Sequence, residues 1–553
     1  MKKLAFIAFT LLLFAVADIN AQPAGVKKAA NAVFTLTTFK ADGTILATTH
    51  GIFIDNDGTA LTTFSPFVGA FSATVIDARG KSMPVDYIIG ANELYDVAKI
   101  KVEGLTSAVP LTNKVSKNTK VWLVPYALGT PSFTQTKIAE IEKFNTSYNY
   151  YIFDTQAPEN TNACPFVTQE GKVIGLLVHS NTDNDVHAID ALFADSLKVN
   201  GLSSLDPALK QTQICTALPN KEPDALLTLM MAKESSNKKN LAKYIRNYIN
   251  KFPTSAEGYR QQAELDLTEG DSVSADKMYQ DAIAKAVKKD EAHYNYANAI
   301  YFNNGRYPGW TMDKAYQEAE TAYRISPQPV YNFLMAQSTF GKGDYSKAYD
   351  MFMKLTKSSI RNAEIFVDAA LCKKMMKAPE QEVISLLDSA VNVYPKPILV
   401  KDAPLAAPGY LARGNEYFNL GKYREAIMDY NEYDTLSFFR STPQFYYIRY
   451  KCEMQIHQWQ QALNDIAHAI VLNPKEPTYY AEMASLELRV NQLDDAIKTA
   501  QRCTEIAPQY SDGYLLLGLA QIQNHQKAEG LANLSKAKEL GDSRADQYIK
   551  KYK

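Results

Sequence analysis

The chain has 553 residues, more than one hydrophobic core usually organises, so we expect two or more domains. Lys and Arg number 59 and Asp and Glu number 60, which gives a formal net charge of -1. This balance argues against a strongly basic nucleic-acid-binding surface and against an acidic tail. Apolar residues make up 46% of the chain, which excludes wholesale disorder.

The N-terminus has the pattern of a secretory signal peptide. Lys2 and Lys3 precede an apolar run over residues 4–17, and the small residue Ala21 follows a polar stretch. This pattern predicts a signal peptide over residues 1–21, with an uncleaved anchor as the alternative. No later run reaches 18 apolar residues, so we expect a periplasmic or secreted chain with no membrane span after signal removal.

The five cysteines are too widely spaced for a zinc site, at positions 164, 215, 372, 452 and 503. A bridge between Cys164 and Cys215 is conceivable in an oxidising compartment, because spacing alone does not decide it. We expect no metal and no cofactor, since the chain has no phosphate-binding loop, HExxH or EF-hand motif.

The two halves of the chain have different residue patterns. Short β-rich runs separated by turn residues fill residues 28–200 and predict an antiparallel sandwich or barrel domain. The Gly-, Ser- and Pro-containing stretch 201–221 is the expected linker. Helix-period patterns occupy residues 222–545, and a polar tail of residues 546–553 ends the chain.

The helical half repeats itself. Small residues at positions 426, 462, 496 and 530 recur at intervals of 36, 34 and 34 residues, and Tyr446, Tyr480 and Tyr514 recur at 34. A helix pair cannot bury its apolar face alone, so the next pair must cover it. The period predicts about nine stacked helix pairs.

This period and its Tyr, Ala and Pro positions resemble the tetratricopeptide repeat family. The resemblance implies an all-α superhelix whose groove binds a protein or peptide. By position within the repeat, the groove-facing candidates are Asn415, Asn419, Tyr447, Lys451, Gln455 and Arg489.

Four segments of the β half occur in the order seen in trypsin-like serine proteases of the bacterial stress-protease type. They are GIFIDNDGTALTTFSPF (51–67), YDVAKIKV (95–102), NACPFVTQEGKVIGLLV (162–178) and HAIDALFADSL (187–197). The resemblance implies two six-stranded β-barrels with a site between them.

The resemblance also places the catalytic triad. The Asp position falls on Asp96, but the His position falls on Ser65 and the nucleophile position on Asn162. Without a hydroxyl nucleophile and an imidazole base, the first step of serine-protease peptide hydrolysis cannot occur. Ala163 and Cys164 replace the two glycines that precede Pro165, which also puts the oxyanion hole in doubt. Cys164 lies two residues from the nucleophile position, and His50, His179 and His187 are expected away from the His position.

The leading interpretation is a secreted or periplasmic scaffold that is not an enzyme, with a degenerate protease domain and a partner-binding repeat array. Two alternatives remain open: a serine-type peptidase with substrate-recruiting repeats, and a scaffold subunit of an envelope complex for nutrient or glycan uptake. The sequence does not decide the partner, the oligomeric state, or whether the β domain binds peptide.

Overall fold

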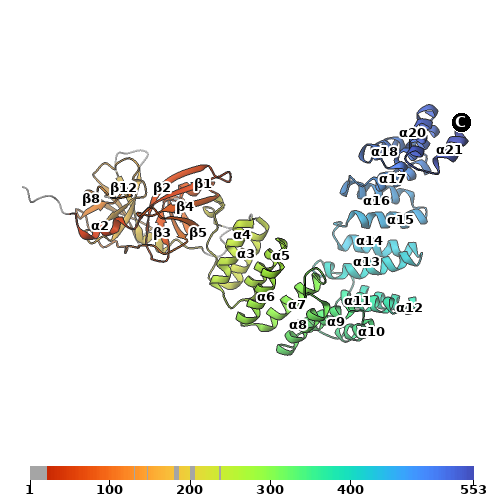
Figure 1. Cartoon of the computed structure of the whole chain (residues 1–553), viewed down its shortest axis with the longest axis horizontal. Helices are drawn as coiled ribbons and strands as arrows, with labels where there is room; N and C mark the ends of the chain where they lie inside the picture. The colour runs from red at the N-terminus through yellow and green to blue at the C-terminus, as the bar shows by residue number, and fades with distance from the viewer. Residues whose placement is uncertain (1–21, 130, 146, 180–185, 200–205, 236–237) are drawn as a thin grey trace, which may run out of the picture. The chain divides into compact units, whose positions relative to one another are not determined.

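The computed structural model describes residues 22–553, apart from residues 130, 146, 180–185, 200–205 and 236–237 (Figure 1). The expected signal peptide over residues 1–21 lies outside the described residues. The chain divides into two compact units, Met1–Lys289 and Asp290–Lys553, and each is described by itself.

The first unit opens with a short helix, α2 (Ala24–Ala30), and a closed antiparallel barrel with the strand order β1-β2-β3-β6-β5-β4. Alternate residues of β1, namely Phe34, Leu36 and Thr38, are fully buried, as expected for a strand with one face toward the core. The strands are β1 (Val33–Phe39), β2 (Ile45–Phe53), β3 (Thr59–Thr62), β4 (Ser72–Ile76), β5 (Ser82–Asn92) and β6 (Val97–Val102).

A second closed barrel repeats this connectivity, with the order β10-β11-β12-β9-β8-β7. Its core includes Phe153 and Phe166, whose rings stack at 4.0 Å between centroids. The strands are β7 (Lys120–Leu123), β8 (Thr134–Phe144), β9 (Tyr148–Phe153), β10 (Pro165–Val167), β11 (Val173–His179) and β12 (Val186–Asp190). Two barrels of identical connectivity confirm the trypsin-like double barrel of the predicted fold class.

The segment that follows the second barrel pairs with the first one. After the 3-10 turn η4 (Leu209–Gln211), the amide of Ile88 donates to the Cys215 carbonyl at 2.8 Å, and the amide of Ala217 donates to the Ile88 carbonyl at 2.8 Å. Within the expected linker, residues 215–217 are therefore bonded to barrel strand β5.

Two helix pairs complete the first unit: α3 (Glu222–Ser235) with α4 (Lys238–Lys251), and α5 (Ala256–Thr268) with α6 (Ser272–Lys285). Helix α4 lies against the first barrel, where Arg246 binds Asp86 at 2.7 Å and Glu103 at 3.1 Å. The hydroxyl of Tyr244 accepts a hydrogen bond from the Thr216 amide at 2.9 Å. The repeat array therefore begins in direct contact with the β domain.

The second unit continues the array from α7 to α21. Its helices are α7 (Lys289–Phe302), α8 (Met312–Ile325), α9 (Pro329–Gly341), α10 (Tyr345–Leu355), α11 (Ala363–Met375), α12 (Glu380–Val391), α13 (Ala403–Asn419), α14 (Tyr423–Leu436), α15 (Pro443–Gln455), α16 (Trp459–Leu472), α17 (Pro477–Arg489), α18 (Leu493–Ile506), α19 (Ser511–Gln523), α20 (Lys527–Glu539) and α21 (Ala545–Tyr552). The run of helices confirms the all-α part of the predicted fold class.

The recurring small residues lie where helices cross. Ala426, Ala462 and Ala496 are all 0% exposed, and a Cβ added at Gly530 would lie 2.7 Å from the Gly518 carbonyl oxygen. Small side chains therefore allow the close helix approach that the repeat requires. The expected polar tail is helical: α21 packs Tyr548 and Ile549 against the last pair. Among the described helices, none combines the length and apolar character needed to cross a bilayer.

Candidate functional site

The triad positions lie between the two barrels, and two of them are in contact. Asp96, in the turn between β5 and β6, accepts hydrogen bonds from the Phe64 amide at 2.9 Å and from the Ser65 amide at 2.6 Å. The Ser65 hydroxyl donates to its second carboxylate oxygen at 3.0 Å. The exposed Ser65 therefore occupies the place beside Asp96 that the resemblance gives to an imidazole.

Asn162 lies in the turn before β10, in contact with His50 of the first barrel. The Nδ1 atom of His50 is 3.3 Å from the Asn162 carbonyl oxygen. β2 extends through His50, and the ring of this strand residue reaches the second barrel at the nucleophile position rather than at the His position. Burial lowers the pKa of His50, so the ring is neutral at pH 7.

The backbone after Asn162 keeps the turn despite its side chains. Ala163 has φ 62°, the left-handed region that glycine favours. Its amide donates to the Leu177 carbonyl at 2.9 Å, and the Cys164 amide donates to the Thr161 carbonyl at 2.9 Å. The chain therefore retains the turn at the cost of strain at Ala163.

Cys164 is fully buried, and burial raises the pKa of its thiol to about 12. A thiol with so high a pKa supplies almost no thiolate at pH 7 and is a poor nucleophile. Burial likewise raises the pKa of Cys215 to about 12, and both cysteines are free thiols in this structure. The Cys164–Cys215 bridge left open by the sequence is not formed here.

Two of the six groove candidates, Tyr447 and Lys451 of α15, contact α13 and α17 on a surface that we call the A-helix face. The ammonium of Lys451 lies 4.8 Å from the ring centroid of Tyr447 and 5.7 Å from that of Phe418. The Tyr447 hydroxyl donates to Glu482 at 3.3 Å. Arg489 lies over the Trp459 ring at 5.6 Å. This arrangement presents a cation, a carboxylate and aromatic rings together.

The remaining three groove candidates, Asn415, Asn419 and Gln455, make fewer contacts on the A-helix face. Asn415 accepts a hydrogen bond from the buried Tyr430 hydroxyl at 2.9 Å, which gives its side chain a structural partner. Asn419 and Gln455 are exposed near the ends of α13 and α15.

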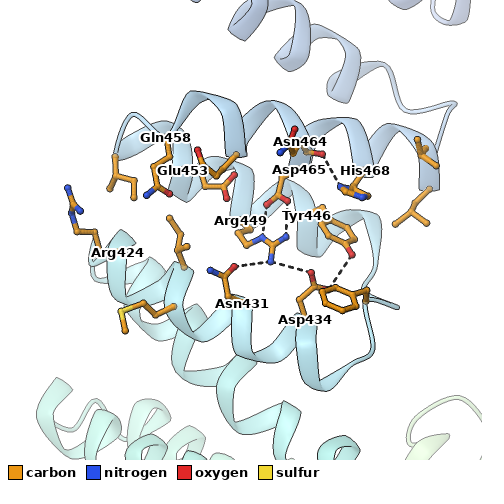
Figure 2. A pocket seen from close by; sticks show the side chains of 17 residues that line it. Arg424, Asn431, Asp434, Tyr446, Arg449, Glu453, Gln458, Asn464, Asp465 and His468 are labelled. Atoms are coloured by element: carbon orange, nitrogen blue, oxygen red, sulfur yellow. Dashed lines mark hydrogen bonds and ion pairs between the residues drawn. The ribbon is translucent and has the colours of Figure 1, made fainter.

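A cleft in the repeat array was not predicted from the sequence. It has a volume of about 890 Å³ and lies on the opposite side of α15, between α14 and α16. We call it the Arg449 cleft (Figure 2). Its charged and polar lining contains Arg424, Asn431, Asp434, Tyr446, Arg449, Glu453, Gln458, Gln461, Asn464, Asp465 and His468. Among the residues that the structure describes, no group of His, Cys, Asp and Glu has the arrangement of a metal site.

Comparison with known proteins gives limited matches. No family model matches the chain. A curated protein of Saccharomyces cerevisiae, "Small glutamine-rich tetratricopeptide repeat-containing protein 2", is 28% identical over 93 residues, which cover 17% of this chain and 27% of that protein. A solved HtrA-type protease (AlgW) with a tripeptide is similar at 18% identity and a TM-score of 0.27, over 31% of this chain and 60% of that one. The chain thus spans about a quarter of its curated relative.

Proposed function

We propose that the protein is an exported, non-catalytic scaffold whose helix-pair array binds a protein or peptide partner. One observation supports the loss of catalysis above the others: the Ser65 hydroxyl, not an imidazole, hydrogen-bonds Asp96. A hydroxyl cannot take up a proton at neutral pH as the base of a triad does, so the Asp96 carboxylate has no base to orient. Asn162 offers a carboxamide where a nucleophile would stand.

The imidazole that does approach Asn162 does not replace that base. His50 meets a backbone carbonyl oxygen, from which no nucleophile can be made. The one thiol of this turn, Cys164, is buried and protonated. These contacts favour a structural or peptide-docking role for the barrels over hydrolysis.

The A-helix face supports the binding role. Lys451 and Tyr447 are half-buried, so each is held by the helices yet reachable from solvent. The Lys451 ammonium is available for a partner carboxylate, and Glu482 for a partner cation, while the rings supply apolar area. The tetratricopeptide repeats of the curated relative point the same way. The N-terminal pattern of residues 1–21 supports export to the periplasm or beyond.

The catalytic half of the proposal is tested with a fluorophosphonate probe on the purified full chain. We expect no covalent labelling, with a circular dichroism spectrum that reports a folded protein. Stoichiometric labelling of a serine would overturn the proposal in favour of a peptidase.

The binding half is tested by capture from envelope extracts on the immobilised full chain. We expect a retained protein that is lost with Lys451→Glu. Lys498→Glu is the matched control, because Lys498 is 75% exposed on α18 and its ion pair is with Asp495 of the same helix. Retention that is equal for both variants would contradict the assignment of the A-helix face. Retention of a glycan-handling assembly would instead favour the uptake-complex alternative.

A further inference from the structure

The Arg449 cleft is built around a guanidinium that two acidic side chains already occupy. Arg449 makes a bidentate pair with Asp465, at 2.7 Å and 2.8 Å. Its remaining contacts are with Asn431 at 3.1 Å and Asp434 at 3.3 Å (Figure 2). These contacts use four of the five guanidinium N–H groups, and none of them reaches the third acid of the cleft, Glu453.

Glu453 is a buried carboxyl group with one unused oxygen. The residue is only 4% exposed, yet its Oε2 atom has no hydrogen-bond partner in the structure. Its other interactions are with Asp465 and Arg449. A buried polar atom without a partner costs about 1–3 kcal/mol, so a ligand that supplies a donor there recovers this free energy.

The charges around Glu453 favour a cationic donor. Three acids line the cleft, Asp434, Asp465 and Glu453, against one buried cation, Arg449. A second cation, Arg424, lies exposed at the rim. Desolvation and the neighbouring Asp465 raise the pKa of Glu453, and the Arg449 charge opposes this rise only in part.

The rim of the cleft is apolar. Met428, Phe439, Val471 and Leu472 line it and are 69%, 70%, 76% and 50% exposed. Exposed apolar side chains around a polar floor suit a ligand with an apolar stem and a charged end. A free inorganic cation would leave this rim uncovered.

We propose that the Arg449 cleft binds the side chain of a lysine or arginine from a peptide segment, with its N–H donated to Glu453 Oε2 and its aliphatic stem on the apolar rim. The site lies on the opposite side of α15 from the A-helix face, so it goes beyond the scaffold function proposed above. Binding transfers the Glu453 proton to solvent and leaves an ion pair in the cleft.

The proposal requires binding to strengthen as pH rises above neutrality. Asp465 from α16 and Arg449 from its own helix interact with Glu453. The other charged or titratable groups that line the cleft are His468 from α16, Asp434 and Arg424 from α14, and Tyr446 from α15. Deprotonation of Glu453 makes the cleft more negative as pH rises, which favours a cationic ligand. The lysine probe stays charged up to about pH 10.

The experiment measures the anisotropy of a fluorescein-labelled Gly-Leu-Lys-Leu-Gly peptide with the full chain. We expect Glu453→Gln to weaken binding about 10- to 100-fold, as for loss of a charge-assisted hydrogen bond. Glu487→Gln is the matched control: Glu487 lies 34 residues further on, is 3% exposed and also has an unpartnered Oε2, but does not line the cleft. It should bind as the wild type does.

Two further arms complete the test. Val471→Lys adds a like charge at an exposed rim position, where folding is insensitive to the change, and should also weaken binding. A peptide with norleucine in place of lysine should not bind. The proposal is overturned if the wild type does not bind the lysine peptide, if Glu453→Gln or Val471→Lys binds it as tightly, or if norleucine is accepted equally.

Discussion

Two carboxyl groups, one in the barrels and one in the repeat array, differ in how their own chain satisfies them. Asp96 accepts two backbone amides and the Ser65 hydroxyl, although it is half-exposed. Glu453 is almost fully buried and keeps one oxygen without a partner. A carboxylate whose oxygens both accept hydrogen bonds from the protein itself has a structural role. A carboxyl group with an oxygen that accepts none can accept a hydrogen bond from a ligand. By this measure Asp96 has a structural role in the barrels, and Glu453 is the carboxyl group with an oxygen left for the ligand proposed above.

The strongest test of this contrast removes the cation of the cleft. Arg449→Ala leaves Asp434 and Asp465 buried without their partner, which should destabilise the array by about 3–5 kcal/mol. Hydrogen exchange of α14–α16 and denaturant unfolding measure the loss. Lys498→Ala removes only an exposed ion pair and should change stability by less than about 0.5 kcal/mol. Equal effects from the two variants would contradict the buried network.

The barrel side of the contrast is tested at Asp96. Asp96→Ala deprives the Phe64 and Ser65 amides of their acceptor and places alanine at a residue with φ 45°. We expect a loss of about 2–3 kcal/mol, seen as faster hydrogen exchange in residues 59–67. Ser65→Ala should cost less, because the two amide contacts remain. A larger effect from Ser65→Ala would show that the hydroxyl holds the turn.

A second buried carboxyl group of the repeat array, that of Glu487, makes the stability of the fold depend on pH. Burial raises its pKa from 4.5 to about 7, so the folded state keeps a proton that the unfolded chain releases near pH 4.5. Stability of the wild type therefore falls as pH rises from about 4.5 to 7. Glu487→Gln has no such proton, so its advantage over the wild type should grow by about 2 kcal/mol across this window. Thermal unfolding at pH 5, 6 and 7 measures it, and parallel profiles would refute it.

The smallest effect concerns strain beside Asn162. Ala163→Gly relieves a left-handed alanine and should stabilise the barrels by about 0.5 kcal/mol, since the added freedom of the unfolded chain offsets part of the gain. A small rise in the melting temperature checks this. Destabilisation would show that the buried methyl group contributes more by packing than it costs in strain.

The repeat array could be predicted because its signal is a recurrence. Ala426, Ala462 and Ala496 keep nearly the same spacing, and each is buried at a helix crossing. The barrels were predicted from short motifs, but strands β5 and β8 carry too many polar residues to be seen as strands. Pro84 and Asp86 interrupt the first, and Lys137, Glu140 and Glu142 alternate along the second, whose outer face is solvated.

The candidate sites were harder to predict. Arg449 and Asp465 look like ordinary surface charges on two helices, and only the packing of α14, α15 and α16 places them in one buried network. His50 looked like an unremarkable strand residue, because its contact with Asn162 joins positions 112 residues apart. Pairings between distant residues depend on tertiary structure, which periodicity in the sequence does not report.

The backbone pairing of residues 215–217 on β5 decides where the chain can be divided without breaking contacts of the β domain. A break at the compositional change near residue 222 would preserve that pairing but remove the Arg246 contact with Asp86, and a break before residue 206 would remove both. The Met1–Lys289 unit therefore keeps together the barrels, the paired segment and the first helices that contact the barrel.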